Sequence, residues 1–334
     1  MNEDAIIARY FRPLAEDLPG AGALRDDVAA LTVPPGCELA ITTDALIADV
    51  HFFASDAPAD IAYKALAVNV SDLAAKAAEP LAYSLALMLP RGTSESWLAA
   101  FASGLREAQT HFGIALSGGD TTASPDSPLA IAITAFGTSP AGQMPRRSGA
   151  SAGESLYVSG TIGDAALGLK LRGNTPEAAN WPLSAHERAY LIQRYLRPEP
   201  RLALREALRT HATAAMDISD GLAIDCARLC TASDVTGEVN ASRVPLSSPA
   251  RTALEAAPAL METILTGGDD YEILASIRAG EENAFEAKAR TAGVAVTCVG
   301  KLTQRIENES PLCIICADGT PLALKHSGYD HFIA

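Results

Sequence analysis

Short apolar runs alternate with stretches of helical periodicity along almost the whole chain. The run LAYSLALMLP (81–90) is typical of a buried strand, and SESWLAAFASGLREAQTHFG (94–113) is typical of a helix that begins after Ser94 and ends before Gly113. The alternation returns later, with a strand at 156–160 and a helix at 281–292. Because such a pattern packs helices against sheets, the sequence predicts an α+β fold built from mixed α/β domains.

One segment breaks this alternation. Residues 138–155, TSPAGQMPRRSGASAGES, are rich in glycine, proline and serine, a composition that marks loops and linkers. With 334 residues the chain is long enough for two domains of ordinary size. We therefore expect an N-terminal α+β domain at 1–145 and a C-terminal α/β domain at 146–334.

The charge of the chain excludes two classes of partner. The formal net charge is −14 and the isoelectric point is about 4.9, so the chain repels nucleic acids and anionic membrane surfaces. No run of apolar residues is long enough for a membrane helix. The N-terminus MNEDAIIARYF lacks the basic region of a secretory signal, and six cysteines are too few for a disulfide scaffold. We expect a cytoplasmic protein.

Two cysteines have the spacing of a metal or redox site. Cys313 and Cys316 lie in LCIICA, which is typical of a strand, and residues three apart on a strand point to opposite faces. We therefore favour two small core residues, with a metal or redox pair as the alternative.

Acidic residues recur where the predicted strands and helices meet turns. In SGGDTT (117–122) two glycines predict a turn that brings the backbone close to a ligand, yet the turn carries Asp120 and no lysine. The others are Asp26, Asp27, Asp44, Asp72, Asp217, Asp220, Asp269 and Asp270. Many have a serine or threonine beside them, and such oxygen ligands without His or Cys suit Mg²⁺. The alternative is that each is only a turn or cap residue.

Two of these aspartates interrupt apolar segments. Asp72 lies within a helical stretch and Asp217 follows the apolar run TAAM. A buried carboxylate costs free energy unless it is paired or bound to a metal. The sequence has neither a G-x-x-x-x-G-K-[ST] loop nor the motifs of protein kinases. We therefore expect the acidic segments to bind a polyphosphate through Mg²⁺.

Eight motifs follow one another between about residue 25 and residue 332. They are RDDVAAL, TTDALIADVHF, AYKALAVNVSDLAA, LSGGDTT, RRSGA, DISDGLAID, GGDDYEIL and GYDHF. Together they resemble the thiamine-monophosphate kinase family, in the superfamily of aminoimidazole ribonucleotide synthetase, selenophosphate synthetase and a hydrogenase maturation factor. The resemblance implies an N-terminal domain that pairs with its copy in a homodimer, and a C-terminal α/β sandwich.

The resemblance also implies an activity. ATP and several Mg²⁺ ions would bind in the cleft between the two domains. The γ-phosphoryl group of ATP would pass to thiamine monophosphate, giving thiamine diphosphate and ADP in the last step of thiamine diphosphate biosynthesis.

Individual residues match functional positions of that family. The positions that match metal ligands are Asp27, Thr42, Thr43, Asp44, Asp72, Asp120, Asp217 and Asp220. The positions that match nucleotide contacts are Gly119, Asp120, Arg147 and Ser219, and of these Asp120 and Arg147 are the expected catalytic residues. The positions that match substrate contacts are His51, Asp269 and Tyr329.

Some of these roles have ordinary alternatives. His51 would donate a hydrogen bond to the acceptor phosphate, or it is a solvated loop residue. Tyr329 would lie against the thiamine rings, or it packs at the C-terminus. Arg146 could take the place of Arg147.

The chain departs from the family pattern at two positions. Asp269 stands where the family usually has glutamate, so the carboxylate that would contact the thiamine ring is one methylene shorter. Ala77 stands where the family usually has glycine, and we expect it only to stiffen the helix.

Sister enzymes and a binding protein are the rival hypotheses. Selenophosphate synthetase would need a reactive cysteine near the N-terminus, where this chain has only Cys37, and the hydrogenase maturation factor would end in cysteine, where this chain ends DHFIA. Aminoimidazole ribonucleotide synthetase would lack VHF and GYDHF. A divalent-cation buffer would need neither Arg147 nor two glycine turns.

Overall fold

The computed structural model describes residues 2–124, 126–326 and 328, so Tyr329 lies outside the described residues. The chain divides into two compact units. The first contains residues 1–73 and 78–143, and the second contains residues 74–77 and 144–334. Among the described residues no helix has the length and apolar character needed to cross a membrane.

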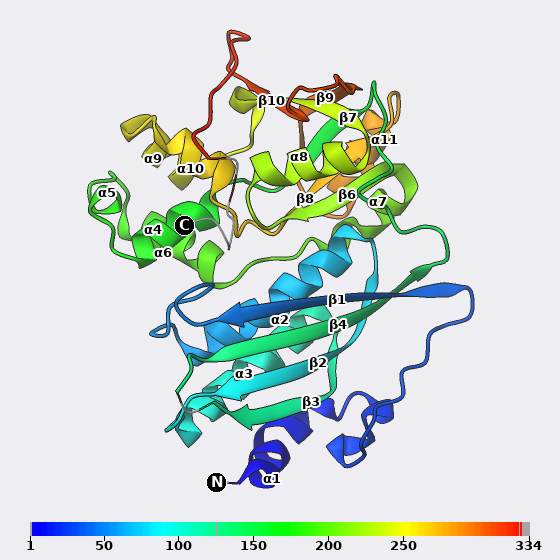
Figure 1. Ribbon diagram of the computed structural model, residues 1–334, viewed down its shortest axis with the longest axis vertical. Coiled ribbons are helices and arrows are strands. Elements are labelled where there is room, and N and C mark those ends of the chain that lie inside the picture. The colour runs from blue at the N-terminus through cyan, green and yellow to red at the C-terminus, as the bar shows by residue number, and fades with distance from the viewer. Residues whose placement is uncertain (1, 125, 327, 329–334) are drawn as a thin grey trace. The chain divides into compact units, whose positions relative to one another are not determined.

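A four-stranded sheet forms the centre of the first unit (Figure 1). Its strands, in the order β1-β4-β2-β3, are β1 (Cys37–Ile47), β4 (Ala130–Pro140), β2 (Glu79–Leu89) and β3 (Ala115–Ala123). The helices α2 (Pro58–Ala75) and α3 (Glu95–Phe112) cover one face of the sheet. The N-terminal helical segments pack against α3 and the β3 edge, and they are α1 (Glu3–Ile6), η1 (Ile7–Phe11), η2 (Arg12–Ala15) and η3 (Pro19–Leu24).

The strands of this sheet alternate between a buried and an open face. On β4, Ile131 and Ile133 are fully buried under the helices, whereas Thr134 points to the other face. On β1, Thr42 and Asp44 pair with buried positions of β4 and therefore face α2. The two threonines predicted as metal ligands thus lie on opposite faces, because Thr43 follows Thr42 along the strand.

The expected glycine turn at 117–122 is wrong. These residues belong to β3, which pairs in parallel with β2. The register shifts between Tyr83 and Ser84, so β3 bulges near Gly118. At Gly119, where φ is 152°, a Cβ atom would lie 1.8 Å from the carbonyl oxygen of Leu85. Glycine is required here by the close approach of two strands, not by a chain reversal.

The second unit is built on a six-stranded sheet with the strand order β10-β7-β9-β5-β8-β6. Its strands are β5 (Ser155–Ser159), β6 (Ala212–Ile218), β7 (Val235–Asn240), β8 (Glu272–Ile277), β9 (Val296–Gln304) and β10 (Leu312–Ile315). Cys313 lies on β10 and Cys316 directly follows it, and both side chains are half-buried.

Helices surround this sheet (Figure 1). They are α4 (Asp164–Arg172), α5 (Pro176–Ala179), α6 (Ala185–Leu196), α7 (Arg205–His211), α8 (Leu222–Ala232), α9 (Ser248–Ala256), α10 (Leu260–Thr266) and α11 (Glu282–Thr291), with short 3-10 turns at Leu202–Leu204 and Ala241–Arg243. The largest core cluster of the unit includes Leu156, Leu167, Leu222 and Leu274, each fully buried.

The expectation for Ala77 is also wrong. Helix α2 ends at Ala75, and Ala77 follows it with a left-handed φ of 53°. The N–H of Ala78 donates to the Leu73 carbonyl and that of Ala77 to the Ala74 carbonyl, which is the Schellman pattern that favours glycine at this position. Ala77 does not stiffen the helix, because it terminates it in a conformation that costs alanine roughly 1 kcal/mol.

Candidate functional site

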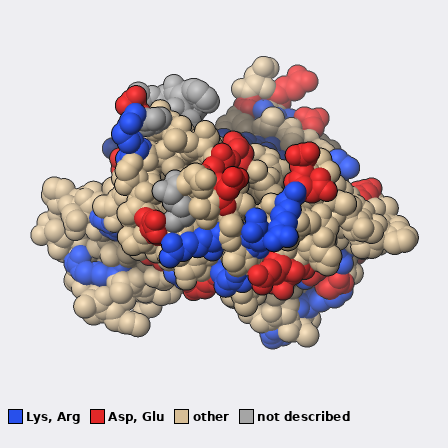
Figure 2. Space-filling model, turned by 90° about the horizontal axis from the view of Figure 1, so that it is seen from below, with Lys and Arg blue, Asp and Glu red and all other residues tan. Residues whose placement is uncertain are grey.

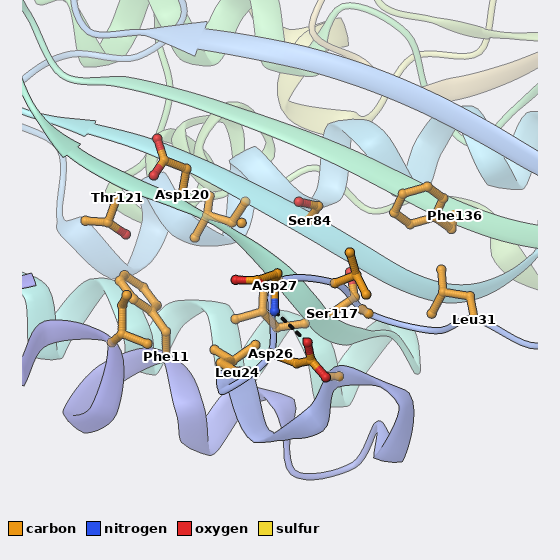
Figure 3. Close-up of a pocket in the computed structure, with 18 of the residues that line it drawn as sticks. Phe11, Leu24, Asp26, Asp27, Leu31, Ser84, Ser117, Asp120, Thr121 and Phe136 are labelled. Carbon is orange, nitrogen blue, oxygen red and sulfur yellow. Dashed lines mark hydrogen bonds between the residues drawn. The ribbon is translucent and has the colours of Figure 1, made fainter. Parts of the chain in front are cut away.

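A pocket of about 430 Å³ lies along β3 in the first unit (Figure 3). The segment that follows η3 forms one wall, with Asp26 and Asp27, and strand β3 contributes Gly119 and Asp120. In Figure 3 Asp120 and Thr121 lie toward one end of the view, and Leu31 and Phe136 lie toward the other. Carboxylates therefore line the pocket from its Asp120 end, where Phe11 also lies, to Asp26 and Asp27 in the middle, and the Leu31 end is apolar. The volume is that of a small-ligand site.

Asp120 and Asp27 reach this pocket from different elements. Asp120 is exposed on β3, opposite Ala86 of β2. The backbone N–H of Asp27 donates to the Asp26 carboxylate at 2.8 Å, a contact that shapes the turn after η3. Three residues predicted to bind metal or nucleotide, Asp27, Gly119 and Asp120, are thus brought together.

A second group of predicted ligands lies between β1 and α2. The Thr42 hydroxyl donates to Asp72 Oδ2 at 2.5 Å, and the backbone N–H of Asp44 donates to Asn69 Oδ1 at 3.1 Å. Thr43 lies on the opposite face, where its hydroxyl lies 2.9 Å from that of Thr134. Asp72 is half-buried, so the Thr42 hydroxyl stabilises a carboxylate that is only partly hydrated.

The two groups do not merge within the first unit. Strands β1 and β3 are the opposite edges of the sheet, three strand spacings or roughly 14 Å apart. Nowhere in the described part of the chain do three or more His, Cys, Asp or Glu side chains converge as they would around a metal ion. The oxygen donors suit Mg²⁺, which keeps several waters and takes phosphate oxygens as further ligands.

His51 lies in the tight loop after β1. Its Nδ1 accepts a hydrogen bond of 3.0 Å from the Ile47 N–H, so the neutral ring carries its proton on Nε2. The ammonium group of Lys64, a buried residue of α2, donates to the His51 carbonyl at 3.1 Å. The ring is therefore held by the last residue of β1, and the loop backbone is held by α2.

In the second unit two predicted segments lie side by side. The turn after β6 carries Ser219 and Asp220, and the turn before β8 carries Asp269. The Asp269 N–H donates to the Ser219 carbonyl at 2.7 Å, and the Tyr271 N–H donates to the Ile218 carbonyl at 2.8 Å. The predicted nucleotide contact and the predicted substrate contact are thus joined by backbone hydrogen bonds.

Asp225 holds the first of these turns. Its Oδ2 accepts the N–H groups of Ser219 and Asp220 at 3.0 and 2.9 Å, and its Oδ1 accepts Arg228 Nη1 at 2.8 Å. Burial raises the pKa of the Asp225 carboxyl to about 6. Arg228 also contacts the Asp220 carboxylate, so this predicted metal ligand is paired with a cation in the structure. Asp217 is buried on β6.

Arg147 is exposed in the segment before β5. Its carbonyl accepts the Ser233 hydroxyl at 2.6 Å, and the carbonyl of its neighbour Arg146 accepts the Ala215 N–H at 3.2 Å. Their backbone is therefore fixed to the second unit. Elsewhere, the face in Figure 2 shows Lys and Arg interspersed with Asp and Glu, so the excess negative charge is not gathered in one patch there.

The sequence reasoning missed the residues that support the predicted ones. Asn69 lies three residues before Asp72 on α2, and Asp225 and Arg228 lie five and eight residues after Asp220. These spacings could have drawn attention to them, but their hydrogen bonds depend on the fold. Nothing in the sequence indicated that Leu31 and Phe136 line the pocket, because apolar residues in or beside a strand are usually core residues.

Comparison with known proteins shows which families the chain is similar to. Residues 25–139 match the N-terminal domain of AIR synthase related proteins, and residues 151–310 match the C-terminal domain. The thiamine-monophosphate kinase of Escherichia coli K12 is 40% identical over 331 residues, covering 99% of this chain and 98% of its own. The chain belongs to the thiamine-monophosphate kinase family.

Other members of the thiamine-monophosphate kinase family support this membership. The Caulobacter vibrioides kinase is 42% identical over 301 residues, covering 89% of this chain and 83% of its own. The crystal structure of the Stenotrophomonas maltophilia kinase has a TM-score of 0.80 at 36% identity, covering 95% of each chain. AaThiL complexed with AMPPCP and TMP has a TM-score of 0.77 at 29% identity, covering 92% of this chain and 91% of its own.

The fold extends beyond the thiamine-monophosphate kinase family. The hydrogenase maturation protein HypE of Escherichia coli has a TM-score of 0.76 at 19% identity, covering 97% of each chain. At that identity the likeness shows the two-domain fold alone.

Proposed function

We propose that this chain transfers the γ-phosphoryl group of ATP to the phosphate of thiamine monophosphate, giving thiamine diphosphate and ADP. The observation that carries the proposal is the 40% identity, over 99% of the chain, to the Escherichia coli thiamine-monophosphate kinase. The complex of AaThiL with AMPPCP and TMP, an ATP analogue and the acceptor, supports the same pair of substrates.

The chemistry requires no general base. The acceptor is a phosphate monoester whose second pKa is near ~6, so its oxygen is mostly dianionic at neutral pH. The barrier to be lowered comes from bringing two polyanions together in line. A kinase-type catalytic loop is therefore unnecessary, and its absence from the sequence is compatible with the reaction.

The pocket on β3 is the proposed nucleotide site. Its apolar end, with Leu31 and Phe136, suits a base, and its acidic end, with Asp120, suits a phosphate chain only through a cation. Gly119 exposes strand backbone beside this end, and we assign Ser219 and Arg147 as further nucleotide contacts. Arg147 would offer a positive charge to the transferring group.

Mg²⁺ is the proposed cation. Several ions would share the metal-matching residues, which supply only carboxylate and hydroxyl oxygens: Asp27, Thr42, Thr43, Asp44, Asp72, Asp120, Asp217 and Asp220. The ions would neutralise charge on both phosphate groups. Asp120 would orient one of them from β3, and the Thr42 hydroxyl would hold Asp72 in place on α2.

His51, Asp269 and Tyr329 are the proposed acceptor contacts. The Nε2–H of His51 can donate to the acceptor phosphate, because Nδ1 accepts from Ile47. The Asp269 carboxylate complements the positive charge of the thiazolium ring.

A homodimer formed through the first unit is also proposed. Leu39 and Ile41 of β1 have exposed fractions of 37% and 61% and lie on the sheet face opposite α2 and α3. A second copy would bury this apolar face. Light scattering of the purified protein tests it, with Ile41→Lys expected to shift the mass toward the monomer. The two domains, 1–145 and 146–334, and the cytoplasmic location remain predictions.

Product analysis tests the activity. The protein is mixed with Mg-ATP and thiamine monophosphate, and the nucleotides and thiamine phosphates are separated by chromatography. Equal amounts of thiamine diphosphate and ADP support the proposal. ADP without thiamine diphosphate would indicate a sister phosphoryl-activating enzyme. If neither product forms, the proposal is contradicted.

A further inference from the structure

The turn that carries Asp269 has a strained backbone. Asp269 and Tyr271 have φ angles of 63° and 50°, in the left-handed region that side chains disfavour. Such conformations persist only where surrounding contacts impose them, and they gather at functional sites. Here the contacts come from two buried carboxyl groups on either side of Tyr271, those of Asp270 and Glu272.

Asp270 anchors the turn to the start of α4. Its side chain is buried, and the Gly163 N–H donates to both of its carboxylate oxygens at 2.9 and 3.0 Å. Gly163 has a φ of 86°, and a Cβ atom there would lie 2.7 Å from Ile264 Cγ2. Only glycine therefore fits at the position that binds Asp270.

Glu272 anchors the other side of the turn. Its side chain has no exposed area, and Oε2 accepts Ser159 Oγ at 2.6 Å and Arg201 Nε at 2.7 Å. Oε1 accepts Arg194 Nη2 at 3.0 Å and is also contacted by Arg201 Nη2. Gly160 leaves room for this carboxylate, because a Cβ atom there would lie 2.1 Å from Oε1.

We infer that Arg201, together with Arg194, is a positioning residue that holds the strained turn and so fixes Asp269 for the acceptor substrate. The two-point contact of Arg201 with Glu272 sets the direction in which β8 begins, and β8 begins three residues after Asp269. Asp270 and Glu272 are buried and Asp269 is only half-buried. The anchors therefore leave Asp269 as the carboxylate of this segment that a ligand can reach.

The inference rests on the proposed function and deepens it. A carboxylate held in advance beside the Ser219 turn suits a cationic acceptor, because no ordering of the turn is needed when the substrate binds. Arg201 would act through Glu272 and would not touch the substrate. Its loss should therefore weaken acceptor binding while nucleotide binding remains.

The test compares Arg201→Met, Arg201→Lys and a control, Arg188→Met. Arg188 on α6 donates to the carbonyls of Leu183, Ala178 and Trp181, so its loss weakens the second unit without touching the turn. Calorimetry gives the Kd of thiamine monophosphate and of AMPPCP for each protein, and thermal unfolding gives Tm. Steady-state kinetics give KM and kcat for both substrates.

We expect Arg201→Met to raise the Kd and KM for thiamine monophosphate by roughly 10- to 100-fold. The Kd for AMPPCP should stay at the wild-type value. Arg201→Lys, which keeps the charge but loses the planar fork, should recover part of the loss. Arg188→Met should lower Tm and leave both Kd values unchanged.

Three results would overturn the inference. Acceptor binding could be unchanged in Arg201→Met, both ligands could weaken equally, or Arg188→Met could weaken the acceptor as much as Arg201→Met does. Failure of the proposed function is distinguishable, because the wild-type protein would then neither bind nor phosphorylate thiamine monophosphate.

Discussion

The hydroxyl of Thr42 donates a 2.5 Å hydrogen bond to Asp72 Oδ2 and thereby joins the edge strand β1 to helix α2. Replacing Thr42 by valine keeps the shape but removes the donor from a half-buried carboxylate, which should cost roughly 2 kcal/mol of unfolding free energy. It should also raise the Mg²⁺ concentration needed for half-maximal activity. Urea unfolding measures the change in unfolding free energy, and magnesium titrations of the activity measure the change in the magnesium requirement.

Thr43→Val is the matched control for stability, because Thr43 is exposed and its hydroxyl contacts the half-buried Thr134 on the other sheet face. It should cost less than about 1 kcal/mol. Thr43 is also a proposed Mg²⁺ ligand, so Thr43→Val should raise the magnesium requirement without this loss of stability, and an unchanged requirement would remove Thr43 from the proposed ligands.

Asp120→Asn should leave the fold intact and abolish most turnover. The side chain is exposed, so the unfolding free energy should change by less than about 0.5 kcal/mol. Loss of a metal ligand should lower kcat/KM by roughly 100-fold or more. Asp17→Asn, at an exposed aspartate outside the pocket, is the control. Wild-type activity in folded Asp120→Asn would refute the metal role.

Gly119→Ala should destabilise the first unit, whereas Gly118→Ala should not. A Cβ atom at Gly119 would meet the Leu85 carbonyl, while nothing lies within 4 Å of the corresponding position at Gly118. We expect a loss of roughly 2–3 kcal/mol for Gly119→Ala and less than about 0.5 kcal/mol for Gly118→Ala. Thermal unfolding gives the Tm of both variants. Equal Tm values for Gly119→Ala and Gly118→Ala would contradict the close approach of β3 to β2 at Gly119.

His51 should tolerate glutamine better than asparagine. The amide nitrogen of glutamine can replace Nε2–H, whereas asparagine replaces only the Nδ1 side that accepts from Ile47. We expect His51→Asn to have a kcat/KM for thiamine monophosphate lower than that of His51→Gln by roughly 10-fold. The reverse order would show that His51 acts through Nδ1 or only holds the loop.

Asp270→Asn tests the buried carboxyl by its pH dependence. Burial raises the pKa of Asp270 well above its ordinary value, so the folded protein keeps a proton that the unfolded chain has lost. The stability that this proton contributes is complete below the ordinary aspartate pKa and is lost as the pH rises through the raised, folded-state value. The unfolding free energy of the wild type minus that of Asp270→Asn should therefore fall with rising pH.

That difference changes by at most about 1.4 kcal/mol per pH unit for one proton. Urea unfolding at several pH values above 4 measures it. A difference that grows with pH would mean that Asp270 is ionised and stabilised by the Gly163 N–H and Arg194.

Local signals in the sequence predicted much of the fold. The helix expected at 94–113 is α3, with the Ser94 hydroxyl accepting the Trp97 N–H and with Gly113 left-handed after its end. Both signals act within one turn of helix, so they do not depend on distant residues. The strand expected at 81–90 is β2, shifted by only one or two residues.

Contacts with distant residues could not be predicted. Two adjacent glycines usually mark a turn, and only the Leu85 carbonyl, far away in sequence, shows that Gly119 belongs to a strand. The sequence named Thr42 and Asp72, or Ser219 and Asp269, as separate candidates. Their pairing depends on which strand and helix pack together, and that is a property of the whole fold.

The strand order of the first unit has a consequence for synthesis of the chain. Strand β1 pairs only with β4 in its sheet, and Pro140, the last residue of β4, is the 93rd residue added after Ile47. At ordinary rates a ribosome needs roughly 5–20 s to add these residues. Throughout that interval the nascent segment 37–47, with its apolar residues, has no partner strand. It is therefore the part of the emerging chain where we expect a chaperone to bind.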